Sequence, residues 1–233
     1  GMISTSYEYD SQNRLMSTTT YAGSTTYTSG YVYDNNGNLL NKNTTGIMPA
    51  DEAANMNYTV SSAGDSQEEI SFYYYDVWNQ MIKSTEKDKT ATYAYNPEGY
   101  RVEKTVNSQT TRYLYEYDKV MLEVDEENSQ LARNVYGTNL ISRMADDETL
   151  FYMYNGHADV TALIDTDGQV VGSYYYDAFG NIEEQTGEKD NPFRYAGYQY
   201  DEETDLYYLN ARYYDSKIAR FLQEDTFTGY AND

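Results

Sequence analysis

Tyrosines alternate with other residues in short segments of the chain, and each segment ends at an aspartate or a related polar residue. Residues 174–181, YYYDAFGN, show this unit in full. Because side chains of a β-strand point to alternate faces, Tyr174 and Tyr176 share one face, and Tyr175 and Asp177 share the other. An aspartate can bond its own backbone, and Gly180 permits the left-handed conformation of a tight turn. The unit therefore predicts a strand followed by a chain reversal.

The same frame recurs at residues 7–15, 31–39, 73–81 and 93–102, with glycine or asparagine three positions after the aspartate or its replacement. These two residue types adopt the left-handed conformation most readily, so the pattern indicates a backbone requirement. At position 180, asparagine should therefore be tolerated better than valine.

The residues assigned to structural turns are Asp34, Gly37, Asn79, Gly99, Asp177 and Gly180. An apolar residue usually follows five positions after the aspartate, at Leu15, Leu39, Met81 and Ile182, whereas the copy at Asn96 departs from this and places Tyr100 and Val102 instead.

Intervals between copies of the frame define the organisation of the chain. From Asp10 to Asp201 the steps are 24, 42, 20, 20, 21, 18, 22 and 24 residues, and the step of 42 is two periods. Within that double step, residues 44–69 lose the pattern and turn polar, which indicates a degenerate repeat or an inserted surface loop. A period near 21 with a turn in each copy predicts an all-β fold, a repetitive array of antiparallel β-hairpins in a curved sheet.

The composition supports an array in which tyrosine replaces an aliphatic core. The chain has 30 Tyr, 6 Phe and 1 Trp, and its mean hydropathy is −0.83. A tyrosine buries a large ring while its hydroxyl stays hydrogen-bonded, so tyrosines can hold together a sheet whose faces are not dry. No linker rich in Pro, Gly or Ser divides the sequence, which favours one continuous array.

The charge balance argues against several partners. With 16 basic and 38 acidic residues, the net charge of −22 repels nucleic acid and anionic membrane surfaces. The chain has no cysteine, no apolar run long enough to span a membrane and no signal peptide. It opens Gly1-Met2 and enters a repeat almost at once, so we expect a piece of a longer protein. The end strands of such a piece are unpaired edges, and self-association through them is expected.

The repeats resemble a known family. Units of the form YxYDxxGN are similar to the tyrosine-aspartate (YD) repeats of bacterial Rhs and wall-associated proteins, Tc-toxin C components and animal teneurins. Residues 154–181 (YNGHADVTALIDTDGQVVGSYYYDAFGN) and 191–225 (NPFRYAGYQYDEETDLYYLNARYYDSKIARFLQED) resemble the Rhs repeat-associated core over nearly its whole length. The resemblance implies a YD-repeat array at 1–150, with the insertion at 44–69, and a core segment at 151–233 that continues the array.

What the resemblance implies about function is a hollow β-shell. In Rhs and Tc proteins the core segment plugs one end of the shell, and a C-terminal toxin domain is held inside. The core also carries an aspartyl autoprotease, whose arginine corresponds to Arg212 in NARYYD and whose first aspartate corresponds to Asp225 in RFLQED. The second aspartate and the cleavage site are expected after Asp233, so this half-site should be inactive in the present chain. The family often has Asp-Pro where this chain has Asp215-Ser216 and Asp225-Thr226.

Other candidate residues predict no further chemistry. His157 has no serine or cysteine motif beside it, so we interpret it as part of a turn. The run Asp165-Thr166-Asp167-Gly168 resembles the start of a calcium loop, but position 176, where a bidentate Glu is needed, is Tyr. We therefore expect no metal and no cofactor.

Two functions remain open from the sequence. The first is a structural shell and plug fragment of a secreted bacterial polymorphic toxin, without catalysis in this chain, whose partner is its own C-terminal toxin domain. The alternative is a carbohydrate-binding or cell-surface interaction module that uses exposed tyrosines. By resemblance to the family, either protein is secreted or associated with the cell surface. Whether the tyrosines pack on one another or line an open groove would distinguish the two.

Overall fold

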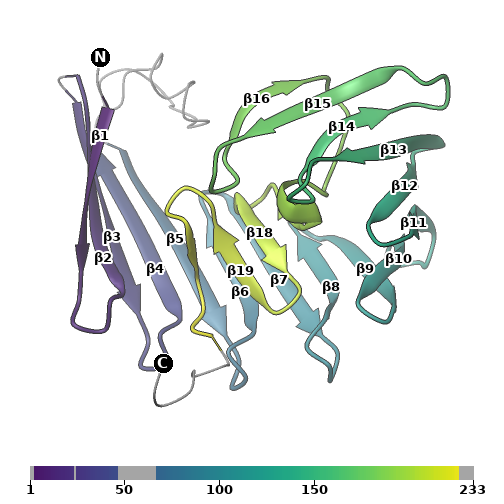
Figure 1. The fold of residues 1–233 in the computed structure, drawn as a ribbon. Helices are drawn as coiled ribbons and strands as arrows, with labels where there is room; N and C mark the ends of the chain where they lie inside the picture. The colour runs from purple at the N-terminus through teal and green to yellow at the C-terminus, as the bar shows by residue number, and fades with distance from the viewer. Residues whose placement is uncertain (1–2, 24, 47–66, 226–233) are drawn as a thin grey trace, which may run out of the picture. The chain divides into compact units, whose positions relative to one another are not determined.

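The computed structural model describes residues 3–23, 25–46 and 67–225, and these form almost only antiparallel β-strands (Figure 1). The predicted all-β class is confirmed. Residues 47–66, most of the insertion expected at 44–69, lie outside the described residues, and the ends of that range belong to the two flanking strands. Within the described residues the only helical element is the single 3-10 turn η1 (Tyr195–Gly197).

The chain divides into two compact units. The first comprises residues 1–89 together with 223–233. Its described strands pair antiparallel, each with the next in chain order, and are β1 (Ile3–Tyr9), β2 (Leu15–Ala22), β3 (Thr25–Tyr33), β4 (Leu39–Gly46), β5 (Gln67–Tyr75) and β6 (Met81–Glu86). Every residue of β1 is exposed, and β1 pairs with β2 alone.

The second unit, residues 90–222, contains two sheets. Ten strands follow one another as antiparallel neighbours in chain order: β7 (Lys89–Tyr95), β8 (Arg101–Val106), β9 (Gln109–Glu116), β10 (Lys119–Val124), β11 (Gln130–Tyr136), β12 (Leu140–Ala145), β13 (Glu148–Tyr154), β14 (Val160–Ile164), β15 (Val170–Tyr176) and β16 (Ile182–Thr186). A smaller sheet has the order β17 (Gln199–Asp201), β18 (Leu206–Leu209), β19 (Arg212–Asp215) and β20 (Arg220–Phe221).

Each turn of the repeat frame is closed by its own aspartate or asparagine. The Asp177 carboxylate accepts hydrogen bonds from the backbone N–H of Phe179 at 2.8 Å and of Asn181 at 2.9 Å. Asp34 does the same for Asn36 and Asn38, each at 2.9 Å. The third residue after the aspartate or asparagine lies at positive φ, which is 83° at Gly37, 61° at Asn79, 89° at Gly99 and 95° at Gly180. The frame therefore specifies a chain reversal through hydrogen bonds within the turn itself, without a partner from another part of the chain.

The last tyrosine of a strand ties that strand to its neighbour. The Tyr75 hydroxyl donates to the carbonyl of Leu39 at 2.9 Å, and Tyr154 donates to Leu140 at 2.8 Å. Tyr176 donates to Val160 at 3.0 Å. Burial raises the pKa of Tyr154 and Tyr176 above the ordinary value, so the hydroxyls remain donors at neutral pH. Phenylalanine could not make this bond, which gives a physical reason for the excess of tyrosine.

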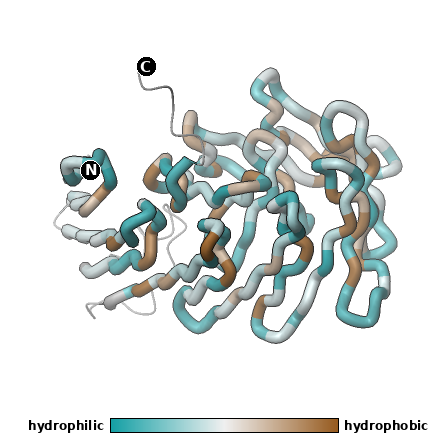
Figure 2. The backbone as a smooth tube through the Cα atoms, turned by 90° about the horizontal axis from the view of Figure 1, so that it is seen from below, coloured by the Kyte–Doolittle hydropathy of each residue, from teal (hydrophilic) through white to brown (hydrophobic). Residues whose placement is uncertain are grey.

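Apolar residues recur within the strands, while the turns between strands are mainly hydrophilic (Figure 2). In the second unit one cluster of buried apolar residues lies under β12 to β15 and is made of Leu140, Leu150, Tyr152, Val160, Leu163, Tyr174 and Phe193. Phe193 comes from the segment that leads into the small sheet. That segment therefore completes the core of the large sheet.

Candidate functional site

A buried arginine stands where other copies of the repeat have an aliphatic side chain. Five positions after the turn aspartate, Leu15 and Met81 are fully buried. At the corresponding position after Asn96 the chain has Arg101, whose exposed fraction is only 1%. Arg101 is the first residue of β8, and the strand geometry points it to the same side as those core residues. A guanidinium at that position requires partners, since burial of an unpaired charge is costly.

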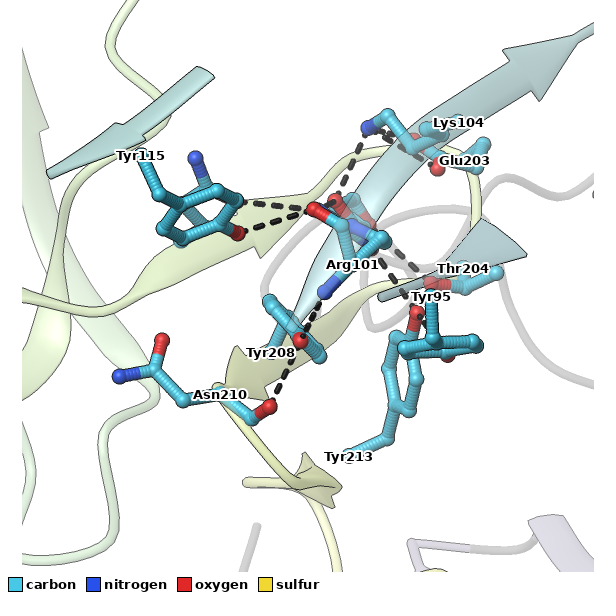
Figure 3. Close-up of polar contacts among 11 residues, drawn as sticks. Tyr95, Arg101, Lys104, Tyr115, Glu203, Thr204, Tyr208, Asn210 and Tyr213 are labelled. Atoms are coloured by element: carbon cyan, nitrogen blue, oxygen red, sulfur yellow. Dashed lines mark hydrogen bonds and ion pairs between the residues drawn. The ribbon is translucent and has the colours of Figure 1, made fainter. Parts of the chain in front are cut away.

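The partners of Arg101 come from the small sheet, one hundred residues later in the chain (Figure 3). The guanidinium donates two hydrogen bonds to Asp201, one of them at 3.0 Å, and one to the side-chain Oε1 of Gln199 at 3.0 Å. Lys104 Nζ lies 2.9 Å from Asp201 Oδ1 and 3.1 Å from Glu203 Oε1. We call Arg101, Lys104, Asp201 and Glu203 the charged anchor. Arg101 and Lys104 belong to β8, whereas Gln199 and Asp201 belong to β17.

Tyrosine rings enclose the charged anchor. The Arg101 guanidinium carbon lies 4.3 Å from the ring centre of Tyr208 and 5.3 Å from that of Tyr113. The Tyr213 hydroxyl accepts a hydrogen bond from Arg101 at 3.0 Å, and the Tyr208 hydroxyl accepts one from the Arg101 backbone N–H at 2.8 Å. Aromatic faces attract a cation, and they also exclude water from the ion pairs. The rings therefore strengthen the attachment of the small sheet.

Opposite charges in the charged anchor set the protonation of its carboxylates. Burial alone would raise the pKa of Asp201, but Arg101 and Lys104 lower it below the ordinary value. Burial and the Asp201 charge raise the pKa of Glu203. Two cations therefore face two carboxylates with different proton affinities. Such an arrangement holds two elements together.

A second set of contacts fixes the small sheet to a turn of the large one. The hydroxyls of Tyr195, Tyr214 and Tyr207 donate to three consecutive backbone carbonyls, those of residues 178, 179 and 180, each at 3.0 Å. The Asn181 side-chain amide donates to the Ser216 carbonyl, also at 3.0 Å. We call the three tyrosines and the carbonyls of residues 178–180 the turn anchor. It joins the YYYDAFGN unit to the segment that follows it.

Gly180 has a role in the turn anchor that the turn frame alone does not predict. A Cβ atom at this position would lie 2.7 Å from two carbon atoms of the Tyr195 ring. Real Cβ atoms essentially never approach so closely, so any side chain must displace the ring. Gly168 has a similar φ of 79°, but a Cβ there meets nothing within 4 Å. Position 180 therefore requires glycine for space as well as for conformation.

The residues expected to be catalytic lie in different compact units. Arg212 begins β19 in the second unit, and its guanidinium carbon lies 3.8 Å from the ring centre of Phe221. Asp225 belongs to the first unit and is exposed. Their pairing in an autoprotease stays a prediction.

Sequence reasoning missed the charged anchor, although a signal was present. In the copy at Asn96, the position five residues later is Arg101, whereas the corresponding position in other copies is apolar. A charged residue at a position that is otherwise apolar indicates a buried charge. The acidic run Asp201-Glu202-Glu203 has the sequence of a solvated loop, and this interpretation is wrong for Asp201 and Glu203. The exposed fraction of the Asp201 side chain is 1% and that of Glu203 is 8%, whereas the neighbouring Glu202 side chain is 68% exposed. Contacts across one hundred residues cannot be read from local spacing.

The described residues contain neither a candidate metal cluster nor a membrane-spanning helix. No cluster of three or more His, Asp or Glu side chains is arranged to hold a metal ion in the described part of the chain. In the same residues, no helix has the length and apolar character required to cross a membrane.

Comparison with known proteins places this geometry in a family. The family model of the teneurin YD-shell matches residues 2–232. The tRNA3(Ser)-specific nuclease WapA of Bacillus spizizenii is 42% identical over 171 residues, which cover 69% of this chain and 7% of that protein. The double-stranded DNA deaminase toxin A of Burkholderia cenocepacia is 26% identical over 167 residues, or 57% of this chain and 12% of the relative. The chain thus spans a small fraction of these relatives.

Solved structures show the same fold. The Photorhabdus luminescens Tc holotoxin pore superposes with a TM-score of 0.56 at 19% identity, covering 96% of this chain and 14% of the matched one. The TcdB2-TccC3-Cdc42 complex gives a TM-score of 0.57 at 19% identity, covering 95% of this chain and 14% of the matched one. The family model extends over nearly all of the sequence, and the hairpin array has the matching architecture. The chain therefore belongs to the teneurin YD-shell family.

Proposed function

We propose that this chain is a shell and plug fragment of a secreted bacterial polymorphic toxin, whose shell encloses a C-terminal toxin domain of the parent protein. The observation that carries this proposal is the double attachment of residues 191–216 to the hairpin array, through the charged anchor and the turn anchor. A segment held at two separate places resists displacement, as a plug must. The similarity to the WapA nucleases and to a DNA deaminase toxin supports a toxin context.

In this proposal the parts of the chain have different roles. Residues 1–150 contribute hairpins to the wall of the shell. Residues 151–233 form the core segment, which continues the wall and then turns inward as the plug. The expected location is extracellular or at the cell surface. Carbohydrate binding by exposed tyrosines and self-association through strand edges stay predictions.

Protease protection tests the enclosure. In the full-length parent protein, the C-terminal domain should resist a protease of broad specificity, because the shell keeps the protease out. Arg101→Met should expose that domain by releasing the plug. Arg133→Met is the matched control, since Arg133 is an exposed arginine of the same sheet. The proposal fails if the C-terminal domain of the native parent is digested as fast as the same domain expressed alone.

We also propose that Asp225 acts in self-cleavage of the parent protein. Two carboxylates that share a proton can hydrolyse a peptide bond. One removes a proton from water as the water oxygen attacks the carbonyl carbon, and the other donates a hydrogen bond to the carbonyl oxygen. The carboxyl group that took the proton from water then passes it to the leaving nitrogen, the C–N bond breaks, and a carboxylate and an amine are formed. Asp225 supplies one carboxylate, the resemblance assigns Arg212 to the same site, and the second carboxylate is expected after residue 233.

The test of self-cleavage is the intact mass of the parent protein after incubation. The wild-type parent should release a C-terminal piece, and Asp225→Asn should abolish the release. Asp167→Asn, which changes an exposed turn aspartate, should cleave like wild type. Processing that continues in Asp225→Asn would show that the catalytic aspartate is a different residue.

A further inference from the structure

The residues just before Asp225 lie against one turn of the hairpin array. In the first unit, Glu224 contacts the turn formed by residues 34–38, which we call the seat. A Cβ atom added at Gly37 would lie 3.0 Å from Glu224 Oε2, 3.2 Å from its Cβ and 3.5 Å from its Cδ. The preceding residue, Gln223, is only 4% exposed. The chain therefore rests closely on the seat immediately before the proposed catalytic aspartate.

The seat is held in one conformation by its own hydrogen bonds and by the next turn. The Asn38 side-chain amide donates to Asp34 Oδ2 and to Asn79 Oδ1, each at 2.9 Å. Asn36 also donates to Asn79 Oδ1, at 3.1 Å. Asn38 is completely buried, and its side-chain oxygen has no hydrogen-bond partner among the described residues. Because two turns brace each other, the seat forms a support on which the residues before Asp225 can be positioned.

The close contact distinguishes Gly37 from a glycine that serves only a turn. Gly37 and Gly168 occupy the same place in the repeat frame, with φ of 83° and 79°. A Cβ at Gly168 meets nothing within 4 Å, whereas a Cβ at Gly37 meets Glu224. Consecutive Cα atoms are joined at a fixed separation of about 3.8 Å, so a shift of the Glu224 backbone also moves the backbone of Asp225.

We propose that the seat positions Asp225 for self-cleavage, and that Gly37 is the positioning residue because it lets Glu224 pack directly on the turn backbone. This inference rests on the proposed function of Asp225. A Cβ at position 37 would require Glu224 to shift by a few tenths of an ångström. Because a misplaced catalytic group slows an enzymatic step, a methyl group at position 37 should lower the cleavage rate without touching the scissile bond.

The test compares cleavage rates in the full-length parent protein. Gly37→Ala should slow release of the C-terminal piece by about 2- to 5-fold. Gly168→Ala is the matched control, because it imposes the same backbone strain without a contact and should leave the rate close to wild type. Glu224→Ala removes the side chain that the new methyl group meets, so the Gly37→Ala/Glu224→Ala double variant should recover most of the rate. All rates are measured at a temperature at which each variant is folded by circular dichroism.

A pH profile separates positioning from loss of stability. Two carboxylates that share a proton titrate far apart, and moving them apart brings their pKa values together. Gly37→Ala should therefore narrow the bell-shaped dependence of the cleavage rate on pH, whereas a loss of folded protein lowers the amplitude without narrowing the curve. Equal rates and equal profiles for Gly37→Ala and Gly168→Ala would overturn the inference while Asp225→Asn still abolished cleavage. Cleavage that persists in Asp225→Asn would overturn the proposed function itself.

Discussion

The charged anchor and the turn anchor hold the same segment by different physical means. The charged anchor consists of two cations and two carboxylates, with Arg101 and Asp201 each 1% exposed and aromatic rings around them. The turn anchor consists of neutral hydroxyls that donate to backbone carbonyls, and its turn lies at the protein surface. The strength of the first depends on protonation and on complete pairing. The second depends on shape and on the absence of a side chain at position 180.

This difference shows two ways in which a copy of the repeat can make specific long-range contacts while it keeps the hairpin structure of the array. The turn anchor uses a standard copy of the frame and adds contacts to atoms that every copy has. The charged anchor replaces a core residue of the repeat and therefore works only in the copy that begins β8. Substitutions should separate the two anchors by the size and kind of their effects.

The largest effect is expected from Arg101→Met. Loss of the guanidinium leaves Asp201 buried with Lys104 as its only cation among the interactions of the charged anchor, and breaking one side of a buried pair costs about 3–5 kcal/mol. The free energy of unfolding, measured by urea denaturation of the present chain, should fall by this amount. Arg133→Met, at an exposed position of the same sheet, should change it by less than about 0.5 kcal/mol. Equal losses would mean that the buried pairing does not hold the segment.

The next largest effect is expected from Gly180→Asn. Asparagine accepts the positive φ, but its Cβ must displace the Tyr195 ring, and overpacking of this kind costs about 1–3 kcal/mol. Gly168→Asn places the same residue in an open turn and should cost less than about 1 kcal/mol. Thermal unfolding of the two variants gives the comparison. In the Tyr195→Ala background the extra cost at position 180 should disappear, and a cost that persists would assign it to the backbone.

A smaller effect is expected from Tyr207→Phe. This substitution removes the hydroxyl that donates to the carbonyl of residue 180 and keeps the buried ring, so it should cost about 1 kcal/mol. Tyr214→Phe removes an equivalent bond at a more exposed position, where water can replace the lost donor, and should cost less. Differential scanning calorimetry of both variants would show the order. A larger loss of stability for Tyr214→Phe than for Tyr207→Phe would contradict the conclusion that the Tyr207 hydroxyl is the more deeply buried of the two.

The smallest change in the free energy of unfolding is expected from a change in pH. It should affect the charged anchor and leave the turn anchor unchanged. The folded pKa of Glu203 is raised, so the stability of the charged anchor should increase as pH falls from neutral through that raised pKa toward the unfolded value of about 4.3. The folded pKa of Asp201 is lowered, so its contribution is present above about 3.9 and is lost only in stronger acid. Burial raises the pKa of the turn-anchor tyrosines, to about 12 at Tyr214, so they stay protonated throughout.

Glu203→Gln tests this pH dependence directly. The variant should be nearly as stable as wild type at neutral pH, because it removes the attraction to Lys104 and the repulsion from Asp201 together. Its free energy of unfolding should rise less on mild acidification than that of wild type. Urea denaturation at pH 7 and pH 5 measures the difference. If the wild type and the variant change in parallel, Glu203 does not have a raised pKa.

The array was predictable from the sequence because its signals are local. A strand of alternating tyrosines and an aspartate followed by Gly180 specify a hairpin within ten residues, and the period repeats that information. The charged anchor was not predictable because Arg101 and Asp201 meet only after the intervening strands have paired. The Tyr195 ring over Gly180 was missed for the same reason, since a turn motif does not indicate what packs on it. The positions of Asp225 and Arg212 follow from resemblance alone.

The turn at Asp165 has a consequence for protein engineering. Its carboxylate bonds the backbone N–H groups of Asp167 and Gln169, at 2.9 and 2.8 Å, and open space surrounds Gly168. The loop is closed by this side chain and by the Gly168 N–H, which donates to the Asp165 carbonyl at 3.1 Å. A foreign peptide grafted at this tip should be exposed to solvent without disturbing the strands on either side. The hairpin array is therefore a candidate scaffold for the display of peptides, with the graft placed at a turn of the repeat.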